Sequence, residues 1–266
     1  MKVLGILAGQ DFLPLEVLKT AKAKGYRTVV ISLIGAAAPG LAESADVFYD
    51  INVGQIDKIL TTLKEEGVTE VVMAGKVTKE LLYRNLSLDQ RAMVLLMSLP
   101  NRNDDTVLLG ITGEIMKEGM QVSSQTDYLA HLLPQKGVLG GLDPDDAQSA
   151  DIAYGFDMAK KIAGLDIGQT IVVKKKAIMA VEAIEGTDQA VKRGGTLAGS
   201  GAVVVKVSKP KQDLRFDIPT VGMNTLQAMI DSQCGVLAIE AEKTFLVDRE
   251  AFLAKADQHG IVVVAC

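Results

Sequence analysis

Residues 2–34, KVLGILAGQDFLPLEVLKTAKAKGYRTVVISLI, decide the fold class. The stretch contains two largely apolar runs, at 2–8 and 27–34, which are typical of strands that are covered on both faces of a sheet. Between them lies a helical pattern with Pro14 in its first turn and Gly25 as its stop signal. A strand, a helix and a second strand in this order indicate a parallel α/β sheet with a right-handed crossover.

The alternation of strand and helix continues through the first half of the chain. Residues 53–67 and 104–119 carry apolar residues at helical spacing, and the strand-like run 69–75 lies between them. We therefore predict a Rossmann-like, parallel-sheet domain over residues 1–133.

The pattern breaks at residues 132–146, where prolines, glycines and acids gather, and we predict a linker at 134–143. Residues 144–266 then predict a second α/β domain. Its expected elements are a helix at 147–166, a hairpin at 169–183, a strand at 201–207, a helix at 225–235, two short strands at 236–247, a helix at 248–260 and a strand at 261–265.

The composition excludes several classes of protein. The chain has 266 residues, a net charge of −5 and no dense stripe of Lys and Arg, which argues against nucleic-acid binding. Two cysteines and two histidines leave little material for a disulfide framework, a zinc site or a Ser-His-Asp triad. The amino-terminal run predicts a buried strand and not a signal peptide, and no run reaches the length of a membrane span, so we expect a cytoplasmic protein.

Glycines follow two of the predicted strands in the first domain. Gly9 precedes the first helix, where backbone N–H groups can hold a phosphate, and Gly75 precedes Lys76, a cation suited to an anionic ligand. The alternatives are a tight strand-to-helix turn and an ordinary exposed lysine. A standard nicotinamide site is weakly supported, because the G-x-G-x-x-G spacing is missing and no acid ends the second strand.

Carboxylates concentrate in the second domain. The stretch AVEAIEGTD supplies Glu182, Glu185 and Asp188, and KVSKPKQDLRFDIPTVG adds Asp213 and Asp217 among several lysines. Oxygen ligands beside lysines suit a hard cation and a phosphate, and Mg²⁺ or Mn²⁺ is the natural choice where His and Cys are scarce. The alternative is an exposed acid on a strand followed by a helix cap.

Taken together, these segments resemble the LpxI family of UDP-2,3-diacylglucosamine pyrophosphatases of lipid A biosynthesis. The resemblance covers nearly the whole chain, and its most distinctive part is VEA.EGTD followed by KP.QD.R.D.PT.G. It implies two α/β domains, a divalent cation, and hydrolysis of the pyrophosphate to UMP and 2,3-diacylglucosamine 1-phosphate.

The resemblance and the residue patterns together give a set of expected site residues. The expected catalytic residues are Asp217, which the resemblance marks as essential, Asp213 and Lys209. The expected metal ligands are Asp217, Glu182, Glu185 and Asp188. The expected substrate contacts are Gly9, Gln10, Gly75, Lys76, Gln212 and Thr220, and the family often has a second glycine where this chain has Gln10.

The expected partner is a glycolipid nucleotide, which implies peripheral contact with the inner membrane. Base rates favour a homodimer. Five apolar residues are expected in helix core or, alternatively, at an acyl site: Leu81, Leu82, Leu95, Leu96 and Met97. Two other functions stay open, a nucleotide-dependent oxidoreductase and a protein that binds a nucleotide sugar or a lipid without turnover.

Overall fold

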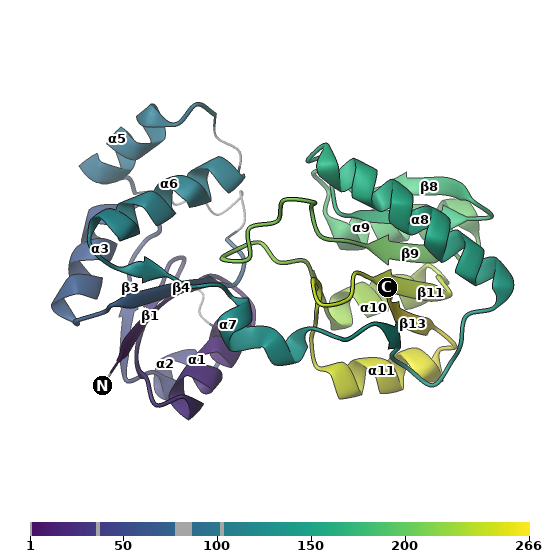
Figure 1. Ribbon diagram of the computed structural model, residues 1–266, viewed down its shortest axis with the longest axis horizontal. Helices are drawn as coiled ribbons and strands as arrows, with labels where there is room; N and C mark the ends of the chain where they lie inside the picture. The colour runs from purple at the N-terminus through teal and green to yellow at the C-terminus, as the bar shows by residue number, and fades with distance from the viewer. Residues whose placement is uncertain (1, 36–37, 78–86, 102–103) are drawn as a thin grey trace. The chain divides into compact units, whose positions relative to one another are not determined.

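The computed structural model describes residues 2–35, 38–77, 87–101 and 104–266. They form two compact units (Figure 1). Unit 1 runs to Ala130 and includes Leu214–Phe216, and unit 2 comprises His131–Asp213 and Asp217–Cys266. Three residues of a loop in the second half of the chain therefore belong to unit 1.

Unit 1 is built on a five-stranded parallel sheet in the order β3-β2-β1-β4-β5. The strands are β1 (Val3–Ala8), β2 (Arg27–Ser32), β3 (Val47–Asp50), β4 (Glu70–Ala74) and β5 (Gln121–Val122). This order confirms the predicted Rossmann-like sheet. The central strands β1, β2 and β4 are the predicted apolar runs. The edge strands β3 and β5 were not predicted, because they are short and incompletely buried and so lack a continuous apolar run.

Among the residues that the structure describes, unit 1 contains six α-helices. They are α1 (Leu13–Ala23), α2 (Leu41–Ser44), α3 (Ile56–Glu65), α5 (Gln90–Ser98), α6 (Asp104–Lys117) and α7 (Thr126–Leu129), after which a 3₁₀ turn covers Ala130–Leu132. Ile56, Ile59, Leu60 and Leu63 on α3 are buried in one core, as their spacing predicts. Phe216 is buried in the same core, which explains why its loop segment belongs to unit 1.

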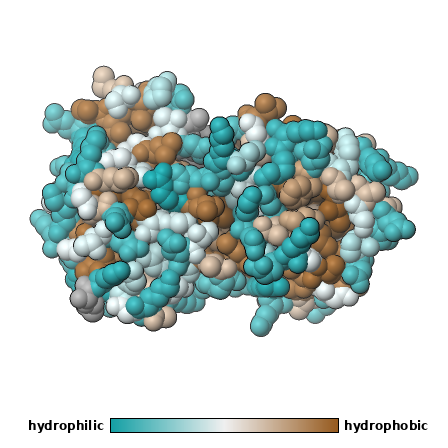
Figure 2. Space-filling model, in the orientation of Figure 1, coloured by the Kyte–Doolittle hydropathy of each residue, from teal (hydrophilic) through white to brown (hydrophobic). Residues whose placement is uncertain are grey.

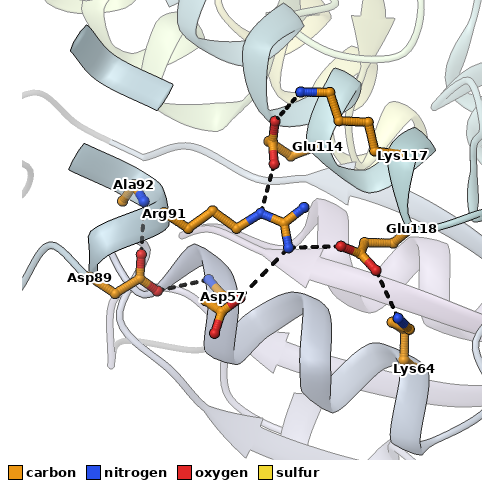
Figure 3. Close-up of polar contacts among 8 residues, drawn as sticks. All are labelled: Asp57, Lys64, Asp89, Arg91, Ala92, Glu114, Lys117 and Glu118. Atoms are coloured by element: carbon orange, nitrogen blue, oxygen red, sulfur yellow. Dashed lines mark hydrogen bonds and ion pairs between the residues drawn. The ribbon is translucent and has the colours of Figure 1, made fainter. Parts of the chain in front are cut away.

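An ion-pair network joins three helices of unit 1 (Figure 3). Arg91 on α5 lies 2.6 Å from Glu114 in the last turn of α6, 2.8 Å from Glu118 just after α6, and 3.6 Å from Asp57 on α3. Lys117 and Lys64 contact the same two glutamates, at 2.6 Å and 2.8 Å. We call these residues the Arg91 cluster.

Unit 2 has a six-stranded mixed sheet in the order β6-β13-β11-β9-β7-β8. The strands are β6 (Gly137–Val138), β7 (Thr170–Lys174), β8 (Ala177–Val181), β9 (Val203–Lys206), β11 (Val236–Ile239) and β13 (Val262–Ala265). The strands β9, β11 and β13 are parallel, and β7 and β8 form the predicted antiparallel hairpin. A separate short pair joins β10 (Thr220–Val221) to β12 (Phe245–Leu246), so the two strands predicted at 236–247 lie in different sheets.

Helices cover both faces of this sheet. The helix α8 (Asp146–Gly164) packs Ile152 and Ala159 on one face. The helices α9 (Thr187–Ala198), α10 (Met223–Asp231) and α11 (Arg249–Gln258) pack residues such as Phe252 on the other. Side chains of β9 alternate between these two cores, which is why the strand reads as a continuous apolar run.

The predicted linker contributes to the second sheet. Within 134–143, β6 pairs antiparallel with β13, and the backbone N–H of Gly141 donates to the carboxylate of Asp257 at 3.0 Å. This segment is therefore an ordered part of unit 2.

Exposed apolar side chains are scattered among polar ones on the face drawn in Figure 2. Among the residues considered for an acyl site, Leu95 is 8% exposed and belongs to the core, whereas Met97 is 83% exposed. Leu81 and Leu82 lie outside the described residues. Within the described ranges, no helix combines the length and the hydropathy needed to cross a membrane.

Candidate functional site

The carboxyl ends of β1 and β4 bring four predicted substrate contacts together in unit 1. Gln10 and Lys76 pair through two backbone hydrogen bonds of 2.8 and 3.0 Å. A Cβ on Gly9 would lie 2.7 Å from the carbonyl carbon of Gly75, and Gly75 has a φ of +85°. Both glycines are therefore required by the close approach of two backbone segments, which supports the tight-turn interpretation of this edge.

A depression of about 560 Å³ lies elsewhere in unit 1. Its lining runs from the end of α6 along β5 and includes Met116, Gln121, Ser123 and Arg215. None of the predicted site residues lines it.

The carboxyl edge of the sheet in unit 2 collects the other predicted residues. The strands β8, β9 and β11 run in one direction and end at Val181, Lys206 and Ile239. The VEAIEGTD segment follows β8, and the loop 207–219 follows β9. Ligands of α/β proteins bind at this edge of the sheet, because the loops that follow parallel strands converge there.

Lys209, Gln212 and Asp217 lie together in the loop 207–219. The Gln212 side chain accepts from the backbone N–H of Lys209 at 3.2 Å and donates to the backbone carbonyl of Asp217 at 2.7 Å. Lys209 Nζ lies 2.7 Å from the carboxylate of Asp166 and 3.8 Å from that of Asp217. The structure thus brings one expected lysine, one amide and one carboxylate together. Asp213 lies in the same loop, and Thr220 begins β10 just after it.

Asp217 has an unusual backbone conformation. Its φ of +58° lies in the left-handed region, which costs most residues roughly 1–2 kcal/mol and Asp or Asn somewhat less. The Asp217 side chain is 47% exposed, so the carboxylate is open to a ligand from solvent. Strained residues of this kind gather at functional sites, where the surrounding structure holds them in place.

The acids of the VEAIEGTD segment each have a different partner. Glu182 accepts from the Thr187 hydroxyl at 2.8 Å, and Thr187 in turn accepts from Lys206 Nζ at 2.6 Å. Glu185 pairs with Arg193 at 2.5 Å, and this guanidinium lowers the pKa of the Glu185 carboxyl. Asp188 accepts from the hydroxyl of Thr225 at 2.8 Å. Glu182 follows β8, which ends at Val181, so it lies in a loop and not on the predicted strand.

The arrangement of these carboxylates can be compared with the expected metal site. Among the residues that the structure describes, no group of three His, Cys, Asp or Glu side chains is arranged to hold a metal ion. Mg²⁺ commonly uses only one or two carboxylates and takes its other ligands from water and substrate phosphates. The half-exposed carboxylate of Asp217 fits that kind of binding, whereas Glu185 and Asp188 are held by Arg193 and Thr225.

The sequence analysis missed a charged group beside this loop. Glu240 follows β11 directly and contacts Lys160 of α8 and the backbone of Ser208. The available signal was an acid at the carboxyl end of a predicted buried strand, in VLAIE. Lys160 carried no such signal, because it lies on a helix next to a second lysine, Lys161.

Comparisons with known proteins agree with the resemblance. A family model described as the LpxI N-terminal domain matches residues 3–132, and one described as the LpxI C-terminal domain matches residues 135–264. The "UDP-2,3-diacylglucosamine pyrophosphatase LpxI" of Caulobacter vibrioides is 33% identical, over 99% of this chain and 97% of that protein.

Similarities to solved structures are distant. CobK precorrin-6A reductase is 12% identical with a TM-score of 0.35, over 100% of this chain and 87% of that one. A biotin carboxylase from Campylobacter jejuni is 13% identical with a TM-score of 0.29, over 74% of this chain and 42% of that one. Neither similarity indicates a function. The two family models and the full-length relative do identify the protein: the chain belongs to the LpxI family.

Proposed function

We propose that the protein hydrolyses the pyrophosphate bond of UDP-2,3-diacylglucosamine to UMP and 2,3-diacylglucosamine 1-phosphate, a step of lipid A biosynthesis. Membership of the LpxI family supports this, as does the activity for which the Caulobacter relative is named, since that relative matches 99% of the chain. The proposed enzyme is a hydrolase that acts on a phosphoric anhydride.

The observation that carries the proposal is the arrangement of Lys209, Gln212 and Asp217 in one loop at the carboxyl edge of the second sheet. In hydrolysis, water adds to one phosphorus while the bond from that phosphorus to the bridging oxygen breaks. A half-exposed carboxylate such as Asp217 can orient that water and accept its proton. Lys209 supplies positive charge for the phosphate that leaves, and Gln212 holds the backbone of Asp217. The catalytic role of Asp213 belongs to the same proposal.

We also propose that the reaction depends on Mg²⁺ or Mn²⁺. Asp217 would hold the ion together with substrate phosphate oxygens, and Glu182, Glu185 and Asp188 are the further candidates in the family motif. When bound, the ion would neutralise charge on the pyrophosphate. Substrate contacts are proposed for Gly9, Gln10, Gly75, Lys76, Gln212 and Thr220.

The proposal extends to location and assembly. An acylated substrate would bring a cytoplasmic enzyme into peripheral contact with the inner membrane, which flotation with anionic lipid vesicles can measure. A homodimer is proposed from base rates. Light scattering of the purified protein at several concentrations tests it.

The proposed activity is tested by incubating the protein with UDP-2,3-diacylglucosamine and Mg²⁺ and separating the products. We expect UMP and 2,3-diacylglucosamine 1-phosphate in equal amounts. Matched incubations should contain UDP-N-acetylglucosamine, which has the same pyrophosphate without the two long acyl chains, and NADH. Binding of the acylated substrate without release of UMP would make the protein a binding protein, and enhanced NADH fluorescence would favour an oxidoreductase.

A further inference from the structure

Glu240 is a buried carboxylate with several donors. It is the residue after β11, and its side chain is only 8% exposed. Lys160 Nζ lies 3.0 and 2.9 Å from its two oxygens, Lys243 Nζ lies 3.1 Å from one of them, and the backbone N–H of Ser208 donates at 2.8 Å. We call these four residues the Glu240 cluster.

The donors offset the cost of burying the charge. An isolated buried carboxylate is strongly destabilising unless it is paired and hydrogen-bonded. Burial by itself favours the neutral acid, yet the hydrogen bonds from Lys160, the Ser208 amide and Lys243 lower the pKa of the Glu240 carboxyl below its ordinary value. Glu240 is therefore ionised at neutral pH and binds its donors as an anion.

Both backbone groups of Ser208 are held by this charge pair. Its N–H donates to Glu240, and its C=O accepts from Lys160 Nζ at 2.8 Å. Hydrogen bonds to charged groups are about twice as strong as those between neutral groups. Ser208 is 1% exposed, so water does not compete for these bonds. The loop that carries the candidate site thus leaves the sheet from a fixed point.

Hydrogen bonds continue from this point to Asp217. Ser208 is joined by its peptide bond to Lys209. The backbone N–H of Lys209 donates to the Gln212 side chain, and this side chain donates to the backbone carbonyl of Asp217. Every residue of this path lies in unit 2. The path ends at the residue whose backbone has a φ of +58°, a conformation that needs support from its surroundings.

We propose that Glu240 and Lys160 are positioning residues, which hold Ser208 and thereby the loop 209–217 in the conformation that orients Asp217. They stabilise the loop without touching the substrate. The kinetic consequence rests on the proposed hydrolysis, whereas the order of the loop does not.

The test uses Glu240→Gln and Lys160→Met in the full chain, with one matched control for each. Glu242→Gln makes the same change two residues away, at an exposed position. Lys161→Met makes the same change at the next residue of α8, where the lysine pairs at 2.7 Å with Asp157 and both side chains are more than half exposed. Lys160→Arg keeps the charge and the donors.

Two quantities are measured in each folded variant: hydrogen exchange of the backbone amides of residues 209–217, and kcat with KM for UMP release. We expect Glu240→Gln and Lys160→Met to speed exchange in this loop about tenfold or more, and to lower kcat about tenfold with KM changed less than about threefold. Lys160→Arg should recover most of both effects, and the two controls should match the parent protein.

The outcomes separate the two proposals. If Glu240→Gln and Lys160→Met have the same hydrogen-exchange rates in the loop and the same kcat as their controls, the positioning role is wrong. A lower melting temperature with unchanged kcat would equally overturn it, because it would indicate a purely stabilising pair. If Glu240→Gln does not fold, Lys160→Met and Lys160→Arg decide the question. If the parent protein releases no UMP, the proposed function fails, while hydrogen exchange still decides whether the cluster orders the loop.

Discussion

The Arg91 cluster of unit 1 and the Glu240 cluster of unit 2 are both built from ion pairs, but they stabilise different parts of the protein. In the Arg91 cluster, the ion pairs of Arg91 join side chains on α3, on α5 and at or just after the end of α6 (Figure 3). The Arg91 side chain is 24% exposed. In the Glu240 cluster the carboxylate is 8% exposed, and its partners include the backbone of a loop. Ion pairs between helices strengthen packing, whereas a buried charge that holds backbone groups fixes the course of a loop.

This difference explains why only one cluster is linked to the candidate site. The Arg91 cluster could be weakened and the three helices would still pack through Leu95, Ile115 and the apolar face of α3. In the loop after β9, Val207 packs in a core of unit 2, and hydrogen bonds at Ser208, Lys209 and Asp217 hold the residues that follow it. Phe216 of the same loop packs in a core that belongs to unit 1.

Removal of divalent metal should have the largest effect, because it acts on the proposed chemistry in unit 2 and leaves the Arg91 cluster intact. Dialysis against EDTA should reduce UMP release to the background rate, and Mg²⁺ or Mn²⁺ should restore it. The melting temperature of unit 1 should stay constant as a control. Full turnover in metal-free protein would contradict the proposed metal dependence.

Arg91→Ala should lower the stability of the protein and leave turnover unchanged. This variant tests the role given to the Arg91 cluster. Losing Arg91 leaves the largely buried carboxylate of Glu114 with Lys117 alone, and we expect a cost of about 1–2 kcal/mol, between exposed and buried ion pairs. Urea unfolding measures it. Lys117→Met, at a side chain that is 71% exposed, is the matched control and should cost less than about 0.5 kcal/mol.

Arg91→Ala also gives a prediction for turnover. UMP release by folded Arg91→Ala should equal that of the parent protein at saturating substrate. A marked fall in kcat would show that the Arg91 cluster serves the reaction, and the contrast between the two clusters would be lost.

Acid should weaken the Arg91 cluster. Lys117 and Arg91 lower the pKa of the Glu114 carboxyl below its ordinary value of 4.5. A carboxyl with a lowered folded-state pKa contributes stability above pH 4.5, and this stability is lost as the pH falls through the lowered value. As the pH falls below 4.5, the urea midpoint of the parent protein should therefore fall more steeply than that of Glu114→Gln. Equal slopes would show that Glu114 contributes nothing to the acid sensitivity.

Much of the fold was predictable because burial leaves a strong pattern. The runs at β1, β2, β4 and β9 are covered on both faces, and helices such as α3 bury one regular stripe. The edge strands β3, β5 and β6 were missed, because partial exposure at an edge removes that pattern. The segment 134–143 was predicted as a linker from the glycines and prolines in and beside it, and β6 within it adds an edge strand to the second sheet.

The candidate site was predictable in part. The sequence identified Lys209, Gln212 and Asp217, and the structure brings them together. It did not predict the left-handed backbone of Asp217, because Ile218-Pro219 biases only the residue before the proline towards extended structure. Nor did it predict Lys160 beside Glu240, because 80 residues separate them and only the packing of α8 on the sheet brings them together.

Asp217 gives the most direct test of the account. Asp217→Asn is the sharpest variant, because Asn tolerates the left-handed backbone while it lacks the carboxylate charge, whereas Asp217→Ala also adds about 1 kcal/mol of backbone strain. The measurement is kcat for UMP release from UDP-2,3-diacylglucosamine with Mg²⁺, in variants shown to be folded by their melting temperature. The account predicts a loss of at least about 10²-fold in both variants, with Asp217→Asn as stable as the parent protein. Near-normal turnover in stably folded Asp217→Asn would contradict it.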